Sequence, residues 1–449
     1  MINGKKGSLT IFLALSMLIF MTFCLVLTEG VRFYFLRTKA AQAMELAQFS
    51  VLSEYQYDLL KQYGVFFLDL DYEQGSEKQS ILEQRFQKYL SLNAEEIVTA
   101  DLITGKFQRA TDNGGQPFFE QAVELMKVQS GYKVFEEITG ISDMGEGLDL
   151  GKILEENTGA ANTIMNQYRD EDGKPFFSIA LPNVSFPSIR KLTEAIFGSE
   201  SMLSDKTVDL KERLLYRNVI GESKGRKKMP ATDMQLFHAY LFEHFGRYGD
   251  TGEHVWKNAL EYQLEYIIAG KESDQKNLEN IMWRIFLMRA GGNYLFYHQD
   301  PEKIGKAEAE AMLLVGITGN PDIINCVKEI LLIAQAIEEG IQQTKSIFAG
   351  AKLPLYQNDL LGNIQMGYEE YLYLFLNTTD QKQKIYRSMD VTELEIRKGN
   401  NYSTFCLDHC VAGFLVEWCW QAESIFEKIP FLESGVYENI IRRNVFYAR

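Results

Sequence analysis

The feature that most constrains this chain is an uncharged apolar run near its N-terminus, residues 8–28, SLTIFLALSMLIFMTFCLVLT. None of its 21 residues is charged, and none is proline or glycine. As an α-helix rising about 1.5 Å per residue, the run would be about 31 Å long, which matches the hydrocarbon core of a bilayer, about 30 Å thick. The run therefore predicts one membrane-spanning helix.

Two lysines, Lys5 and Lys6, lie directly before this run. Basic residues that flank a membrane helix stay on the cytoplasmic side. Residues 1–7 are therefore a predicted cytoplasmic tip, and the chain beyond Thr28 is predicted to be extracytoplasmic. A cleaved secretory signal is the alternative, because it also places a short basic segment before an apolar run. The run exceeds the usual length of about 7–15 residues and no A-x-A-like site follows it, so an uncleaved anchor in the cell membrane is favoured.

The part predicted to be exported is acidic and has ample material for a core. The formal net charge is −15, and residues 1–28 hold two positive charges and no negative one, so the remainder carries −17. Such a surface repels phosphate backbones, which excludes nucleic acid as a partner. Hydrophobic residues make up 46% of the chain and aromatic residues 12%. This composition excludes general disorder.

The membrane helix is predicted to continue as one long amphipathic helix over residues 29–63. Small and aliphatic side chains recur along one helical face at spacings of four and three, which marks a packed helix face. Gly64 is predicted to end this helix, because glycine readily adopts the left-handed conformation of a helix C-cap. Ala40, Ala43 and Ala47 leave a low surface on the helix, and we predict that a helix of a partner protein packs there.

Beyond this glycine, strands and helices are predicted to alternate in an α+β fold of two or more lobes. Residues 64–140 are a predicted small α+β lobe, with a β-prone segment at 65–72 and a helix at 76–92. Residues 141–230, which mix glycine, proline and charged pieces, are predicted to form an irregular connecting region. Residues 231–449 are a predicted C-terminal α+β lobe.

The C-terminal lobe is predicted to combine long helices with strands. Residues 260–268 nearly alternate apolar and polar side chains, the period of two that marks a half-buried strand. Ser273 or Asp274 is predicted to cap a helix that runs through Met288. A last strand is predicted within residues 405–420. Further helices are predicted over residues 231–248, 301–317, 321–348, 372–376 and 381–397.

Patterns that carry chemistry are few. The segment around Asp69 and Asp71 resembles the strand and D-x-D signature of haloacid-dehalogenase phosphotransferases, but Glu73 stands where threonine is expected. The same three acids could bind Ca²⁺, yet Gln74 and Ser80 replace the glycine and the acid of an EF-hand loop. A strand that ends in a polar turn is the favoured interpretation. We therefore predict no catalytic site and no enzyme activity.

The cysteines and histidines match no known metal site. Cys406, His409, Cys410 and Cys419 form C-x-x-H-C with a later cysteine, which is not the spacing of a closed zinc site. On a strand, Cys406 and Cys410 would lie about 13 Å apart, too far for a disulfide or a shared metal. Buried thiols are the favoured interpretation, and a disulfide involving one of them is the alternative. No metal or cofactor is predicted.

The anchor and its exit, residues 5–43, resemble the N-terminus of TadE/TadG-type pseudopilins of tight-adherence (Tad) pili. Those proteins have an apolar helix, a Glu-aromatic-Gly-Arg-like exit and an alanine-bearing extension, and Glu29, Gly30 and Arg32 match that exit. Glu29 lies one helical turn from Arg32, so the two side chains can pair at the outer membrane boundary. The favoured interpretation is nevertheless that Glu29 is simply the first polar residue beyond the lipid.

Type IV pilins are typically cut after a glycine, with glutamate at the fifth position of the mature chain. Gly7 and Ser8 flank the corresponding position here, but the fifth residue after Gly7 is Phe12. This departure argues against processing of the N-terminus.

Four later segments are similar, in order, to an uncharacterised domain family of Gram-positive bacteria that is commonly encoded beside Tad pilus genes. They are LAQFSVLSEYQYDLLKQYGVFFLD, TDNGGQPFFEQAVELMK, LEYQLEYIIAGKESDQKNLENI and YRSMDVTELEIR. The resemblance covers nearly the whole chain. It implies where the protein works rather than a mechanism.

Two classes of function follow. The favoured one is a membrane-anchored extracytoplasmic structural or assembly component of a Tad or type IV-like pilus or secretion apparatus, with the membrane and pilin-like or pilus-platform proteins as partners. The alternative is an anchored extracytoplasmic sensor or ligand-binding protein. In either case we expect the exported part, begun near Glu54, to fold alone without metal or cofactor.

Overall fold

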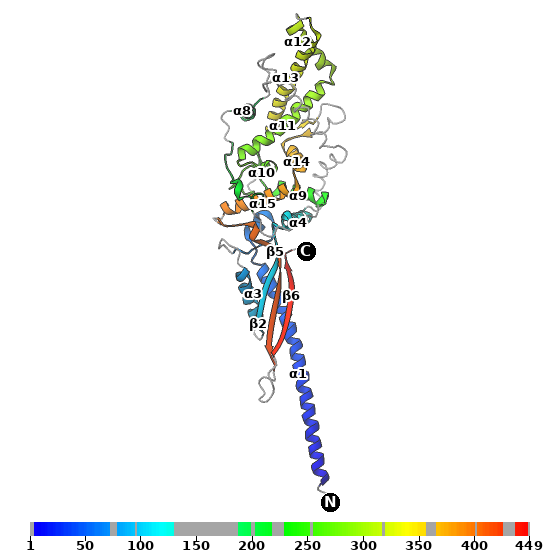
Figure 1. Ribbon diagram of the computed structural model, residues 1–449, viewed down its shortest axis with the longest axis vertical. Coiled ribbons are helices and arrows are strands. Elements are labelled where there is room, and N and C mark those ends of the chain that lie inside the picture. Colours follow the sequence, from blue (N-terminus) through cyan, green and yellow to red (C-terminus); the bar gives the residue numbers. More distant parts are fainter. Residues whose placement is uncertain are drawn as a thin grey trace. The chain divides into compact units, whose positions relative to one another are not determined.

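A computed structural model describes most of the chain, and the described residues fall into two compact units (Figure 1). Unit 1 comprises residues 1–112, 220–223 and 404–449, and unit 2 comprises residues 113–219 and 224–403. Both helices and strands are present, so the predicted α+β class is confirmed. The described residues are 4–71, 79–94, 97–129, 187–198, 203–217, 229–251, 255–316, 319–355, 365–399, 402–424 and 436–447.

Unit 1 begins with the helix α1 (Gly4–Leu52), which has 49 residues and runs without a break through the predicted membrane span. The prediction that the membrane helix continues well beyond the span is confirmed, but the prediction of one helix to residue 63 is wrong. The chain turns after α1 and starts α2 (Tyr57–Tyr63), because the Gln56 side chain accepts the N–H of Asp58 at 2.7 Å and caps a new helix. Gly64 caps α2 in the left-handed conformation, with φ of 65°.

An antiparallel sheet follows in unit 1. Strands β2 (Val98–Arg109) and β6 (Val436–Phe446) pair with opposite edges of β5 (Cys410–Glu423). The two-residue strand β1 (Leu68–Asp69) pairs with the first residues of β5. The predicted strands near residues 65–72 and 405–420 are thus confirmed as shorter or shifted elements. The short 3₁₀ turn η3 (Leu407–His409) leads into β5.

The core of unit 1 lies between this sheet and two helices, the second half of α1 and α3 (Gln79–Asn93). From Phe414 to Ala422 every second residue of β5 faces this core, Trp418 and Trp420 among them. Ala40, Ala43 and Ala47 are fully buried there. The predicted docking of a partner helix on this alanine face is therefore wrong, because α3 and the sheet of the same chain already cover it.

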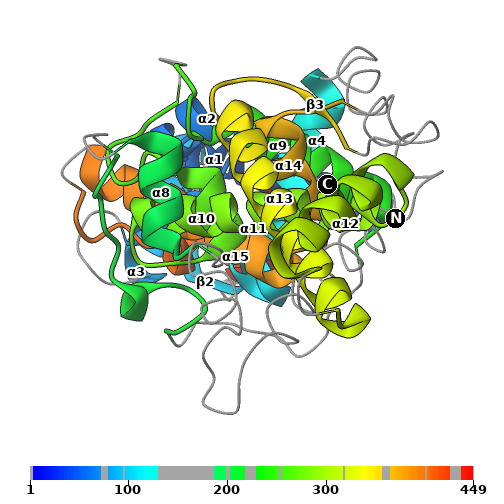
Figure 2. The ribbon, with the colours of Figure 1, turned by 90° about the horizontal axis from the view of Figure 1, so that it is seen from above.

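The described part of unit 2 is mainly helical, and α11 and α13 pack side by side in it (Figure 2). Its elements are α4 (Asp112–Gln129), α8 (Ile189–Phe197), η1 (Leu210–Glu212), α9 (Ala231–His244), α10 (Gln263–Ala269), α11 (Asp274–Tyr297), α12 (Pro301–Val315), α13 (Pro321–Phe348), β3 (Leu353–Pro354), β4 (Gln365–Met366), α14 (Tyr368–Thr378) and α15 (Gln381–Gly399). The predicted helices of this region are confirmed, and the Ser273 side chain caps α11 by accepting the N–H of Lys276.

The strand predicted over residues 260–268 is wrong, because the segment contains α10. Its polar residues Gln263 and Glu265 are as fully buried as their apolar neighbours. The alternation of apolar and polar residues therefore does not separate a solvent-exposed face from a buried one. Instead, it marks polar side chains that make hydrogen bonds inside the protein.

The predicted lobe limits at residues 140 and 230 do not coincide with the limits of the two units. Residues 404–449, predicted to belong to the C-terminal lobe, pair with the N-terminal part of the chain in unit 1. Much of the predicted connecting region, including residues 141–186, lies outside the described residues.

Candidate functional site

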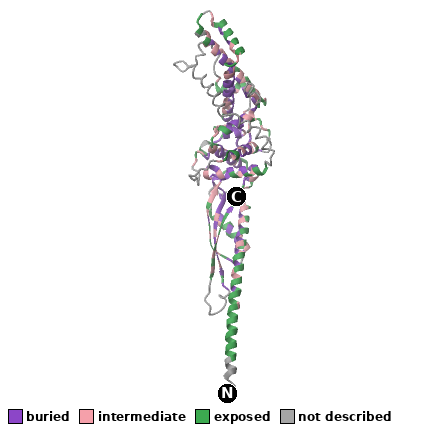
Figure 3. Ribbon diagram, turned by 90° about the vertical axis from the view of Figure 1, so that its right-hand side faces the viewer, coloured by how far each residue is buried: buried purple, intermediate pink, exposed green. Residues whose placement is uncertain are grey.

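The first half of α1 carries a continuous exposed apolar surface. Its most apolar 18-residue window has a mean hydropathy of 2.6, and none of that window is buried. The structure therefore contains one helix among the described residues that is long and apolar enough to span a membrane (Figure 3). Lys5, Lys6, Gly7 and Ser8 lie on this helix, but their side chains fall outside the described ones, so the basic flank and the cleavage position stay predictions.

A polar contact joins α1 to the sheet directly after the predicted span. Glu29 is only 4% exposed, and Arg32 Nη1 lies 3.6 Å from its carboxylate Oε1. This ion pair is the one that a spacing of one helical turn allows, and it overturns the favoured interpretation of Glu29. Arg32 also donates a hydrogen bond of 2.7 Å to the carbonyl oxygen of Glu423, the last residue of β5. Glu29 is therefore more than the first polar residue beyond the lipid.

The first residues of β6 complete this boundary cluster, which comprises Glu29, Arg32, Phe33, Trp420 and Tyr437. Burial raises the pKa of Tyr437, and so does its hydrogen bond to Glu29. The ring of Phe33 lies 4.8 Å from that of Tyr437 and 6.4 Å from that of Trp420. The contacts described for Glu29 come from its own chain, so they fix the sheet to α1. Sequence spacing could reveal Arg32 as a partner but not Tyr437, which is far away along the chain.

A cleft of about 410 Å³ in unit 2 is the second candidate site. Three aromatic side chains line it, Tyr248, Phe348 and Tyr368, with ring centroids 5.6 Å apart for the first two and 4.9 Å apart for the last two. Ion pairs between Arg247 and Glu369 and between Lys352 and Glu370 stand at its border. A cleft that combines aromatic faces with a few polar groups is typical of a small-molecule site.

Glu265 of α10 lies fully buried next to this cleft. Its Oε1 accepts the N–H of Tyr248 at 2.9 Å and the hydroxyl of Tyr368 at 2.5 Å. Its Oε2 has no hydrogen-bond partner among the described residues. Burial raises the pKa of Glu265 to about 7, although these two hydrogen bonds oppose the shift. The carboxyl group is therefore poised to change its charge near neutral pH.

Raising the pH from about 5 to about 8 is expected to lower the free energy of unfolding of unit 2. The folded pKa of Glu265, about 7, lies above its ordinary value of 4.5, so the folded state keeps a proton that the unfolded state has released. Between about pH 5 and 7 the stability therefore falls by about 1.4 kcal/mol per pH unit, about 3 kcal/mol in all, and above about pH 8 it no longer depends on this group. Urea titrations at several pH values measure this loss.

Glu265→Gln is the matched control, because its side chain stays neutral at every pH. Asp390 and Glu395, whose pKa values burial also raises to about 7, change stability in the same direction and remain in the variant. The variant should therefore lose stability less steeply with pH than the parent. Equal slopes for the two proteins would contradict the assignment.

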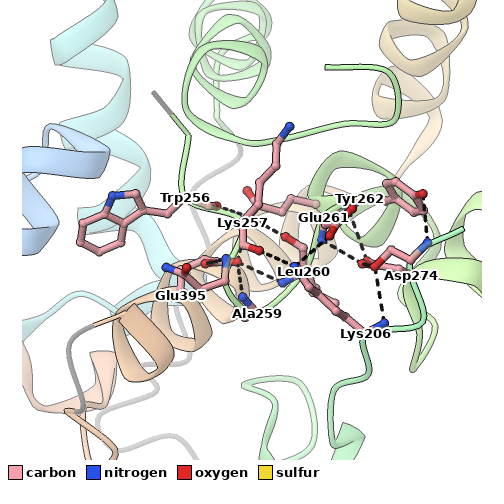
Figure 4. A network of polar contacts seen from close by, with 12 residues as sticks. Lys206, Trp256, Lys257, Ala259, Leu260, Glu261, Tyr262, Asp274 and Glu395 are labelled. Carbon is pink, nitrogen blue, oxygen red and sulfur yellow. Dashed lines mark hydrogen bonds and ion pairs between the residues drawn. The ribbon is translucent and has the colours of Figure 1, made fainter. Parts of the chain in front are cut away.

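Glu395 of α15 organises a third cluster of polar contacts, shown in Figure 4. Its Oε1 accepts the N–H groups of Ala259 and Leu260 at 2.9 and 3.0 Å and the side-chain amide of Gln263 at 2.9 Å. Its Oε2 accepts the N–H of Asn258 at 2.6 Å. One carboxyl group thereby satisfies four donors of the segment that leads into α10. These four contacts order the segment that leads into α10.

Asp274 holds the other side of the same segment. Its carboxylate accepts the N–H groups of Glu261 and Tyr262 at 2.8 and 3.3 Å and the hydroxyl of Ser204 at 2.6 Å. Asp274 was predicted only as a candidate helix cap. Sequence reasoning missed Glu395 and this role of Asp274, because both act on backbone groups distant in sequence.

The acidic and cysteine patterns of the sequence form no described site. Asp69 accepts the N–H of Asp71 at 2.9 Å, which is the predicted polar turn, while Glu73 and Gln74 lie outside the described residues. All five cysteines are free thiols, and Cys410 is buried. Cys406 precedes the turn η3 rather than lying on a strand, so the predicted extended spacing to Cys410 is wrong. No group of three or more metal-ligating side chains occurs among the described residues.

Comparison with known proteins gives a family but no activity. No curated protein and no solved structure matches the chain. The family model described as "Family of unknown function (DUF5702)" matches residues 182–360 and 362–422, more than half of the 449 residues. Membership of an uncharacterised family is thereby confirmed, but over residues 182–422 rather than over nearly the whole chain. The chain belongs to the family of unknown function DUF5702.

Proposed function

We propose that this protein is a membrane-anchored extracytoplasmic structural or assembly component of a Tad or type IV-like pilus or secretion apparatus. The observation that carries the proposal is the division of α1 into two halves. The first half exposes large apolar side chains, and the second half is buried against the sheet of unit 1. Such a helix holds unit 1 at the membrane and leaves its apolar half free to pack beside other membrane helices.

Two further observations support the proposal. The N-terminal segment resembles TadE/TadG-type pseudopilins, and the chain belongs to a family that we associate with Tad pilus genes through its sequence resemblance. The exposed apolar surface of α1 also extends beyond Glu29 to Val31, Tyr34 and Phe35. Because the alanine face is occupied, we propose this exposed face as the surface that meets a pilin-like or platform protein.

Photo-crosslinking in native membranes tests this proposal. A photoreactive residue is placed at Tyr34 or Phe35 on the exposed face, and at Ala43 as the buried control. We expect adducts with a pilin-like or platform protein at the first two positions and none at Ala43. Adducts with lipid alone at Tyr34 and Phe35 would show that α1 is only a tether.

The proposed orientation is tested by protease treatment of intact cells from which the wall has been removed. With the N-terminus inside, residues beyond Thr28 should be digested. Complete protection of these residues would contradict an extracytoplasmic location.

An anchored sensor or ligand-binding protein is the second candidate, and the cleft lined by Tyr248, Phe348 and Tyr368 favours it. A ligand that binds only the folded protein raises its melting temperature. The purified chain can be screened in this way against wall-derived sugars and peptides. A rise that is lost in both Tyr248→Ala and Phe348→Ala would favour this function over a purely structural one.

A further inference from the structure

The sheet of unit 1 runs alongside α1 for the whole length of β6 (Figure 1). Two hydrogen bonds join the sheet and the helix at opposite ends. Arg32 donates to the carbonyl oxygen of Glu423 at 2.7 Å, and the hydroxyl of Tyr447 donates to the carbonyl oxygen of Leu52 at 2.8 Å. A position along β6 therefore corresponds to a height along α1.

The dimensions of the two elements agree with this parallel arrangement. From Arg32 to Leu52 the helix rises about 30 Å at about 1.5 Å per residue. From Tyr437 to Tyr447 the strand advances about 33 Å at about 3.3 Å per residue. Strand β6 thus lies beside α1 over nearly the same length, and the beginning of β6 lies at the height of the boundary cluster.

The boundary cluster lies very close to the predicted membrane span. Arg32 follows Thr28 by four residues, which is about 6 Å along a helix. The polar headgroup region adds about 5–8 Å on each side of the hydrocarbon core. The contact between Arg32 and Glu423 therefore falls within the headgroup layer, and the ends of β5 and β6 fall there with it.

The exposed side chains near the boundary cluster are of the kinds that occur in a lipid headgroup layer. Tyr34 is 73% exposed, Phe35 59% and Val436 55%. Aromatic side chains favour the membrane interface, where an apolar ring and a polar edge are both accommodated. Further along β6, the exposed face carries Arg442, which pairs with Glu417 at 3.0 Å and suits water.

We infer that the end of the sheet at Glu423 and Val436 lies in the lipid headgroup layer, so that unit 1 rests on the membrane by its sheet as well as by its anchor. This inference rests on the proposed membrane insertion of α1. It adds a second membrane contact, which would restrict the tilt of unit 1 relative to the membrane. Residues 425–435, which join the two strands, lie outside the described residues.

A ladder of spin labels on one face of β6 tests the inference. Cysteines are placed at Val436, Ile440 and Asn444, which are about 13 Å apart in succession. A marker is placed at Leu18 within the predicted span. The full chain, with its five native cysteines replaced by alanine, is reconstituted into phosphatidylcholine and phosphatidylglycerol vesicles. Collisions with a water-soluble nickel chelate are then measured. We expect them to be severalfold rarer at Val436 than at Asn444, with Ile440 between them and Leu18 fully shielded.

The outcomes separate this inference from the proposed anchor. Equal collisions at Val436 and Asn444 with Leu18 shielded would overturn the inference and leave the anchor in place. An exposed Leu18 would contradict both. If the cysteine-free chain does not fold, a photoreactive residue at Val436 or Asn444 of the otherwise native chain replaces the labels. Lipid adducts at Val436 alone support the inference, and equal yields at both positions overturn it.

Discussion

A fragment that begins at Glu54 is expected to lose the fold of unit 1, whereas a fragment that begins at Glu29 keeps it. The second half of α1 supplies six buried side chains to the core of unit 1, and Leu36, Met44 and Val51 are the largest. Each of these three contributes about 2 kcal/mol by burial. Their loss removes about 6 kcal/mol, comparable with the whole stability of a typical domain, about 5–15 kcal/mol. The expectation that a fragment begun near Glu54 folds intact is therefore revised.

Tryptophan fluorescence and limited proteolysis distinguish the two fragments. Trp418 and Trp420 are fully buried in the core of unit 1, so their emission should shift to longer wavelength in the shorter fragment. Protease should then cut within β2, β5 and β6 of that fragment, while the core of α11 and α13 in unit 2 stays protected. Equal protection of the three strands in both fragments would show that α1 is dispensable for the fold.

Replacing Glu395 by alanine is expected to destabilise unit 2 by about 4 kcal/mol. The change leaves three backbone N–H groups of residues 258–260 without their acceptor, two of them buried, and an unmet buried donor costs about 1–3 kcal/mol. The Gln263 amide loses one acceptor but keeps the carbonyl oxygens of Trp256 and Leu260. Relief of the desolvation that raises the pKa of Glu395 offsets part of this cost. Urea titration measures the total, and hydrogen exchange at the amides of Ala259 and Leu260 locates it.

Two further variants make the test specific. Glu395→Gln keeps one carbonyl oxygen and should lose less stability than the alanine variant, because only the remaining donors are stranded. Glu338→Ala removes an exposed carboxylate from α13 of the same unit and should change stability by less than about 0.5 kcal/mol. If Glu395→Ala behaved like Glu338→Ala, the carboxyl group would not hold the segment.

Local signals in the sequence were sufficient for most of the helices. The apolar run predicts α1, and Ser273 marks the beginning of α11 by a hydrogen bond that spans three residues. Gly64 ends a helix as predicted, but that helix is α2. The sequence did not reveal the beginning of α2, because glutamine, which caps it at position 56, is not a common capping residue. The Glu29–Arg32 pair follows from one helical turn in the same way.

Local signals in the sequence could not predict the features that depend on segments distant along the chain. The alternation in residues 260–268 cannot predict α10, because the partners of its polar groups, Glu395 and Tyr368, arrive from later in the chain. The alanine face of α1 signals close packing, yet its spacing does not say whether a partner protein or the chain's own α3 approaches it. The cleft beside Tyr248 likewise assembles side chains from three separate segments.

The pairing of β5 with β2 has a consequence for the order in which this protein folds. Arg109 pairs with Val411, and the whole of unit 2 lies between these residues in the chain. Unit 2 is thus inserted into the sequence of unit 1. The pairing of β2 with β5 closes a very long loop, which contains the whole of unit 2. Such a long-range pairing forms late, because its ends meet only after the chain between them is available. During synthesis, β2 would remain an unpaired edge strand until β5 is available, and early folding of unit 2 would shorten this time by bringing the two strands together.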